Sequence, residues 1–62
     1  MIVPFVDSVA GTPVYLNPAY VMSFWPDPGN PEEVTIVKLR DGKPIRVRGD
    51  HEAVARKLQP AA

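Results

Sequence analysis

The chain has 62 residues, no cysteine, one histidine and equal numbers of acidic and basic residues, so its formal net charge is zero. A chain of this length forms one small domain. Without cysteine it has no disulfide bonds or thiolate metal sites, and a single histidine disfavours a zinc site within one chain. We therefore expect no metal and no cofactor, and the balanced charge argues against a general electrostatic attraction to nucleic acid or to anionic membrane.

The size of the chain also limits its stability. Hydrophobic burial contributes about 90 kcal/mol, and ordering the chain costs roughly the same, about 90 kcal/mol. With disulfides and metals excluded, self-association is the remaining means of stabilisation. No apolar run reaches the roughly 18 residues of a membrane span, and the N-terminus lacks the pattern of a signal peptide. We expect a homo-oligomer in the cytoplasm.

Residues 2–6 form an apolar run that predicts the first strand. Pro4 interrupts it, which is typical of an edge strand because proline cannot donate a ladder hydrogen bond. Alternation places Val3 and Phe5 on one face and their neighbours on the other. Because both faces are apolar, we expect one of them to be covered by a helix or by a second subunit.

Two further strands are predicted before residue 26. After a turn at residues 7–12, residues 13–16 form the second strand, and Asn17-Pro18 marks the next turn. The third strand covers residues 20–25. Its alternation predicts that one face enters the core, and the residues on that face are Tyr20, Met22 and Phe24.

Trp25 ends the third strand and precedes a proline-rich stretch, residues 26–33. Two roles are open for Trp25: it packs in the core, or it anchors an interface. Two interpretations are likewise open for the proline-rich stretch. No sheet ladder can pass through three prolines, so the stretch is not a strand. It is either a flexible flap or a loop that binds a partner.

Residues 34–39 and 44–48 predict the central hairpin. The intervening Arg40-Asp41-Gly42-Lys43 contains Asp-Gly, a strong short-range hairpin signal. In the second strand of the hairpin, Ile45 and Val47 are expected to face inward. The arginines between them, Arg46 and Arg48, are expected to face outward.

A short helix is predicted for residues 51–59. Asp50 is a suitable N-cap, and Glu52 in the first turn suits the helix dipole. Val54 and Leu58 are spaced four residues apart and form a narrow apolar stripe. A helix this short is not stable alone, so it must pack on the sheet or on a neighbouring subunit.

No arrangement of residues predicts catalysis. His51 lies in the first turn of the predicted helix and is expected to be solvated. Ser8 and Ser23 have no neighbouring base or nucleophile-elbow context. The acidic residues fall in turns and caps, and no glycine-rich phosphate loop is present. We therefore expect no catalytic residues and no enzymatic activity.

The basic residues near the central hairpin are the only feature that favours a particular ligand. If Lys38, Arg46 and Arg48 share a face, they form a basic strip of the kind with which small β-barrels bind RNA or single-stranded DNA. The alternative is a solvated sheet face, on which arginines discourage edge-to-edge pairing.

Several short motifs between residues 11 and 58 give the chain a resemblance to the FlbD-type family of small bacterial proteins. Matching positions are Leu16-Asn17-Pro18, Val21, Phe24, Asp41-Gly42, Val47, Glu52, Val54 and Leu58. The chain departs from the family in having Val9-Ala10-Gly11 where members have Leu-Asn-Gly, and in its proline-rich insertion. The resemblance implies the order of strands, hairpin and terminal helix, and a link to flagella and swarming. It implies no catalytic residues.

These observations predict a β-rich α+β domain: four or five short antiparallel strands, curled or closed into an SH3-like barrel, with one C-terminal helix. The predicted function is a non-enzymatic, self-associating interaction module. The alternative is a module that binds nucleic acid through Lys38, Arg46 and Arg48. The candidate interface residues are Ile2, Val3, Phe5 and Trp25.

Overall fold

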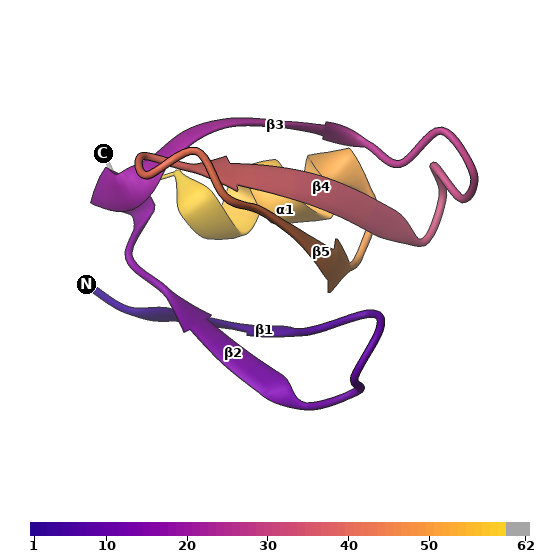
Figure 1. The fold of residues 1–62 in the computed structure, drawn as a ribbon, viewed down its shortest axis with the longest axis horizontal. Helices are drawn as coiled ribbons and strands as arrows, with labels where there is room; N and C mark the ends of the chain where they lie inside the picture. Colours follow the sequence, from indigo (N-terminus) through magenta and orange to yellow (C-terminus); the bar gives the residue numbers. More distant parts are fainter. Residues whose placement is uncertain (60–62) are drawn as a thin grey trace.

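The computed structural model describes residues 1–59, and this part of the chain contains five strands, a one-turn 3₁₀ helix and one α-helix (Figure 1). The strands are β1 (Val3–Val6), β2 (Pro13–Leu16), β3 (Val21–Pro26), β4 (Val34–Leu39) and β5 (Pro44–Arg48). The 3₁₀ helix η1 (Pro18–Tyr20) joins β2 to β3, and α1 (His51–Leu58) follows β5. Each predicted element is confirmed to within one residue at either end.

The strands form two antiparallel sheets. One contains β1 and β2, and the other has the order β3-β4-β5. The β4–β5 hairpin turns through Gly42, whose φ of 90° is accessible to glycine at little cost. The predicted central hairpin supplies two of the three strands of the larger sheet: β4 is its middle strand, hydrogen-bonded on both sides, and β5 is an outer strand.

Backbone pairing joins the two sheets at one point. Asp7, just after β1, forms an isolated bridge with Val47 of β5. The N–H of Ser8 then donates to the carbonyl oxygen of Arg46 at 2.9 Å. Because this contact does not extend into a ladder, the sheets curl toward each other without closing. The predicted β-rich α+β class is confirmed, and the closed form of the barrel is not adopted.

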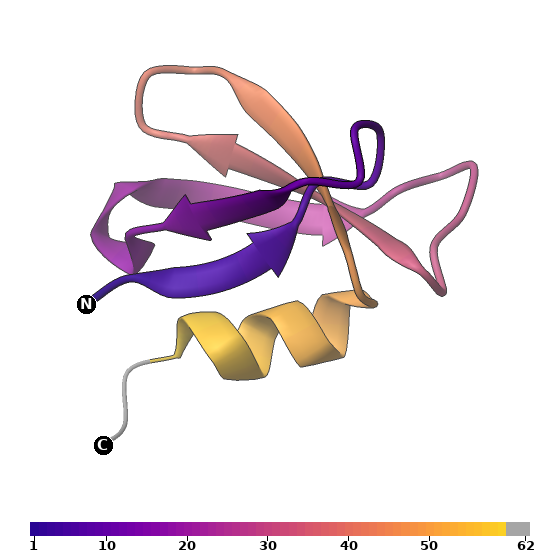
Figure 2. The same ribbon diagram turned by 90° about the horizontal axis from the view of Figure 1, so that it is seen from below.

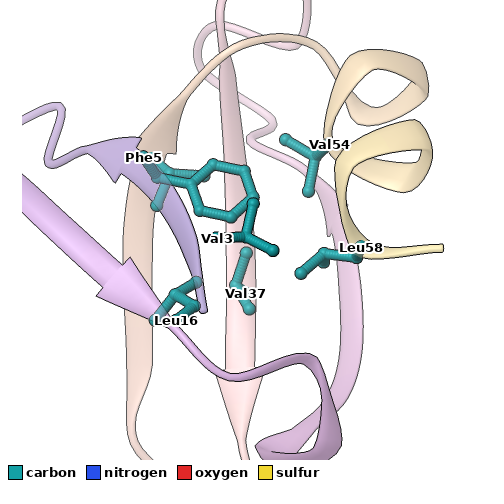
Figure 3. Close-up of a cluster of buried hydrophobic side chains, with 7 residues drawn as sticks. Val3, Phe5, Leu16, Val37, Val54 and Leu58 are labelled. Atoms are coloured by element: carbon teal, nitrogen blue, oxygen red, sulfur yellow. The ribbon is translucent and has the colours of Figure 1, made fainter. Parts of the chain in front are cut away.

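The core lies between the two sheets and α1 (Figure 3). Every strand except β3 supplies a buried side chain, and β3 contributes the partly buried Val21 and Phe24. The fully packed set is Val3, Phe5, Leu16, Val37, Val47, Val54 and Leu58. The predicted inward direction of Val47 and the predicted helix stripe are thus confirmed.

Helix α1 covers part of the core and one edge of the small sheet (Figure 2). Asp50 caps its N-terminus, where its carboxylate accepts the N–H of Ala53 at 2.8 Å. In the last turn, Lys57 donates to the carbonyl oxygen of Pro4, and its ammonium group lies 4.5 Å from the centre of the Phe5 ring. The first alternative for β1, cover by the helix, is the one observed.

The predicted core face of the third strand is confirmed for Phe24 and wrong for Tyr20 and Met22. The register shifts between Val21 and Ser23, so Met22 has no partner on β4. This β-bulge turns Val21 and Phe24 toward the core, whereas Met22 is 64% exposed. Tyr20 belongs to η1 and is also exposed.

Candidate functional site

The outer surface of the larger sheet gathers one candidate interface residue, Trp25, and the three candidate nucleic-acid contacts on β4 and β5. Trp25 pairs with Ile36, which pairs with Arg46, so these three side chains lie in one row across the sheet. Lys38 projects from the same face two residues along β4, and Arg48 two residues along β5. We call this surface, made of Trp25, Ile36, Lys38, Arg46 and Arg48, the open sheet face.

A hollow of about 550 Å³ lies over the centre of the open sheet face. Trp25, Ile36 and Arg46 line its floor, and Asp7 and Val9 approach it from the β1–β2 loop. Trp25 is 39% exposed. Its ring is therefore neither buried in the core nor free in solvent, which is the situation of an aromatic side chain at the edge of a contact surface.

The three cations of the open sheet face do share one face, as the basic-strip hypothesis requires, but acidic groups accompany them. The Nε of Arg46 lies 3.5 Å from Oδ2 of Asp27. Arg48 lines a second hollow, of about 480 Å³, together with Glu32 and Glu33. The local field is consequently mixed in sign, which weakens the attraction of this face for a phosphate backbone.

Residues 27–33, here called the proline loop, connect β3 to β4 and are held by internal hydrogen bonds. Oδ1 of Asp27 accepts the N–H of Gly29 at 2.9 Å, and the carbonyl oxygen of Asp27 accepts the N–H of Asn30 at 3.0 Å. Asn30 in turn accepts the N–H groups of Glu33 and Val34 through its carbonyl oxygen. The loop consists of consecutive turns with a defined shape, and it projects from the end of the sheet (Figure 1).

The four candidate interface residues are separated by the fold. Val3 and Phe5 are 8% and 4% exposed and belong to the core. Their side chains are committed to packing within the chain, which corrects their assignment to a contact surface. Ile2 is 68% exposed at the start of the small sheet, and Trp25 lies on the open sheet face. Of the four, these two remain available to a partner.

The polar residues considered for catalysis are dispersed. His51 is exposed at the start of α1, and Ser23 lies on the open sheet face. Within residues 1–59, no group of three or more His, Cys, Asp or Glu side chains is placed to hold a metal ion.

Asp7 is the one acid in the described part of the chain with a clearly altered acidity. The N–H groups of Ala10 and Val9 donate to its Oδ1 at 3.0 and 2.8 Å. These hydrogen bonds hold the pKa of the Asp7 carboxyl below its ordinary value of 3.8. The carboxylate therefore orders the β1–β2 loop beside the hollow.

In the described part of the chain, no helix is both long and apolar enough to cross a membrane. Comparison with known proteins gave no match: no family model fits the sequence, and neither a curated protein nor a solved structure is significantly similar to it. The candidate site is therefore interpreted from its own geometry.

Proposed function

We propose that this chain is a small bacterial, cytoplasmic module without enzymatic activity that self-associates and acts as an accessory or regulatory component. The observation that carries the proposal is the surface formed by Trp25 and the proline loop. The link to flagella and swarming that the FlbD-type resemblance implies stays a prediction.

Two physical properties support this surface as a contact site. The proline loop is already held in one shape by the hydrogen bonds of Asp27 and Asn30, so little conformational entropy is lost when it binds. Trp25 precedes the loop and is 39% exposed, and tryptophan is one of the side chains enriched among energetically dominant interface residues. A rigid loop beside a large aromatic ring suits protein–protein contact.

The test is the substitution Trp25→Ala. We expect it to raise the dissociation constant of the self-complex at least about tenfold, because loss of a central aromatic anchor typically costs about 2 kcal/mol or more. Sedimentation equilibrium measures this constant. Tyr15→Ala is the matched control, since Tyr15 is 65% exposed on the small sheet and lies outside the surface.

Circular dichroism of both variants checks that they remain folded. An unchanged dissociation constant for a folded Trp25→Ala variant contradicts the assignment of this surface. Equal weakening by both substitutions also contradicts it, because Tyr15 belongs to the other sheet.

A second candidate function is binding of RNA or single-stranded DNA, and one observation favours it. Lys38, Arg46 and Arg48 share the open sheet face with Trp25. Stacking of bases on an aromatic ring beside cations is a common mode of single-strand recognition. The ion pair between Arg46 and Asp27 leaves Lys38 and Arg48 as the cations for such contacts.

The double substitution Lys38→Glu with Arg48→Glu tests this alternative while leaving the Arg46–Asp27 pair in place. Binding of a labelled oligonucleotide should be lost in the variant, and binding by the unmodified protein should fall steeply as salt is raised. If the unmodified protein binds no oligonucleotide at low salt, the alternative is excluded.

A further inference from the structure

The charges of the molecule are separated along its longest axis, which measures 31 Å. The proline loop, the β1–β2 loop and the start of α1 lie at one end, and the β4–β5 turn and the last turn of α1 lie at the other (Figure 1). We call the first the acidic end and the second the basic end. The acidic end carries every acid except Asp41, namely Asp7, Asp27, Glu32, Glu33, Asp50 and Glu52. The basic end carries Lys38, Arg40, Lys43, Arg56 and Lys57.

This separation is concealed by the zero net charge. Arg46 and Arg48 lie outside the basic end, and Arg46 is paired with Asp27. The remaining acids therefore exceed the cations at the acidic end, and the reverse holds at the basic end. Two copies that approach with opposite ends attract each other, whereas two copies that approach with like ends repel.

The basic end also contains an apolar hollow. Tyr20, Leu39, Arg40 and Asp41 line a depression of about 350 Å³. Tyr20 is 58% exposed, and its carbonyl oxygen accepts the N–H of Arg40 at 2.7 Å, which holds η1 against the β4–β5 turn. Asp41 is engaged with its own turn, where its carboxylate accepts the N–H of Lys43 at 2.9 Å.

The proline loop complements this hollow in its apolar prolines and in its charge. Its prolines, Pro28 and Pro31, are exposed, and aromatic-lined grooves are a common receptor for proline-containing segments. Glu32 and Glu33 follow Pro31 directly and carry the charge opposite to that of Arg40 and Lys43. The two kinds of complementarity are independent: that of the prolines is apolar, and that of the glutamates is electrostatic.

We infer that the acidic proline loop of one copy docks in the Tyr20–Leu39–Arg40 hollow at the basic end of a second copy. The inference rests on the proposed self-association and identifies its receptor surface. Because loop and hollow lie at opposite ends of the molecule, the contact forms either reciprocally between two antiparallel copies or once per copy in a head-to-tail row. Both arrangements contain the same contact.

The experiment compares variants by sedimentation equilibrium at low and at high salt. The first variant replaces Glu32, Glu33, Arg40 and Lys43 by glutamine, so the ends lose charge while the net charge stays zero. We expect its dissociation constant to rise about tenfold or more at low salt and to depend less on salt than that of the unmodified protein. Since all four side chains are exposed in turns, the fold should be retained, as circular dichroism will verify.

A pair of reversed variants provides the specific test. Glu32→Lys with Glu33→Lys makes the proline loop basic, like the hollow, and Arg40→Glu with Lys43→Glu makes the hollow acidic, like the loop. We expect each alone to be monomeric and an equal mixture to associate. The apolar part is tested separately by Tyr20→Ala, which should weaken association without altering its salt dependence.

The outcomes separate the inference from the proposed function. Association of the glutamine variant equal to that of the unmodified protein overturns the inference and leaves self-association standing. Failure of the mixed reversed variants to associate, while the unmodified protein does, also overturns it. An unmodified protein that is monomeric at every concentration and at low salt overturns the proposed function and the inference together.

Discussion

Thr35 is the one polar side chain buried completely in the described part of the chain. Its hydroxyl donates to the carbonyl oxygen of Gly49 at 2.8 Å, and Gly49 itself donates to the carbonyl oxygen of Glu33 at 2.7 Å. A buried hydroxyl is tolerated because it is hydrogen-bonded. Thr35 therefore fixes the turn from which α1 departs. Strand alternation predicts that the Thr35 side chain faces inward, but it does not predict this hydrogen bond.

Thr35→Val is expected to destabilise the domain by about 1–3 kcal/mol, since the change keeps the shape of the side chain and leaves the Gly49 carbonyl without its donor. Denaturant unfolding measures the loss. Thr35→Ser is the control, because it keeps the hydroxyl and removes one methyl group. A valine variant more stable than the serine variant would show that the hydrogen bond contributes less than the methyl packing.

Asp7 gives the molecule a predictable response to acid. Because its folded-state pKa is lowered, its contribution to stability is present above the pKa of the unfolded chain and is lost as the pH falls through the lower folded value. The affected window lies below the ordinary pKa of 3.8. We expect the thermal midpoint of Asp7→Asn to depend less steeply on pH in this window than that of the unmodified protein. If the thermal midpoints of the two proteins fell equally steeply with pH in this window, the result would contradict this explanation.

At the scale of the elements, the strands and the helix follow from local signals. The Asp-Gly turn, the alternation of residues 44–48 and the Asp50 cap each have a physical consequence that does not depend on distant contacts. The third strand differs because residues 20–25 are apolar on both faces. Alternation then cannot fix which face is buried, and the bulge at Met22 decides it through tertiary packing.

Helix α1 is short enough that its cap should matter. Asp50→Ala removes the acceptor for the Ala53 N–H and should cost about 1 kcal/mol of unfolding free energy. Asp50→Ser preserves an N-cap acceptor and should cost less. Chemical denaturation followed by far-ultraviolet circular dichroism distinguishes the two. Equal losses in both variants would assign the effect to the charge of Asp50 at the helix N-terminus and not to the hydrogen bond.

The candidate site was predictable only where it depends on strand alternation. The common face of Lys38 and the two arginines follows from the period of two along β4 and β5, and it is observed. The burial of Val3 and Phe5 depends on where α1 packs, which alternation does not specify. The hollow at the basic end requires η1 to lie against the β4–β5 turn, a contact between segments about 20 residues apart in sequence.

At the scale of the whole molecule, the proposed self-association is argued from the small core, the exposed apolar side chains and the separated charges. Within residues 1–59 the hydrophobic cluster contains seven buried side chains, while the large apolar side chains that are more than half exposed include Met1, Ile2, Val9, Tyr20 and Met22. A small core limits the stability of a chain of this length. The separated charges favour one relative orientation of two copies, and the apolar hollow is the proposed contact site.

The most direct test of this account is the mass of the unmodified protein in solution, measured by light scattering over a wide range of concentrations at low and at moderate salt. We predict a mass above the 6.8 kDa of one chain that rises with concentration and falls when salt is added. A mass of 6.8 kDa at every concentration and at both salt levels would contradict it.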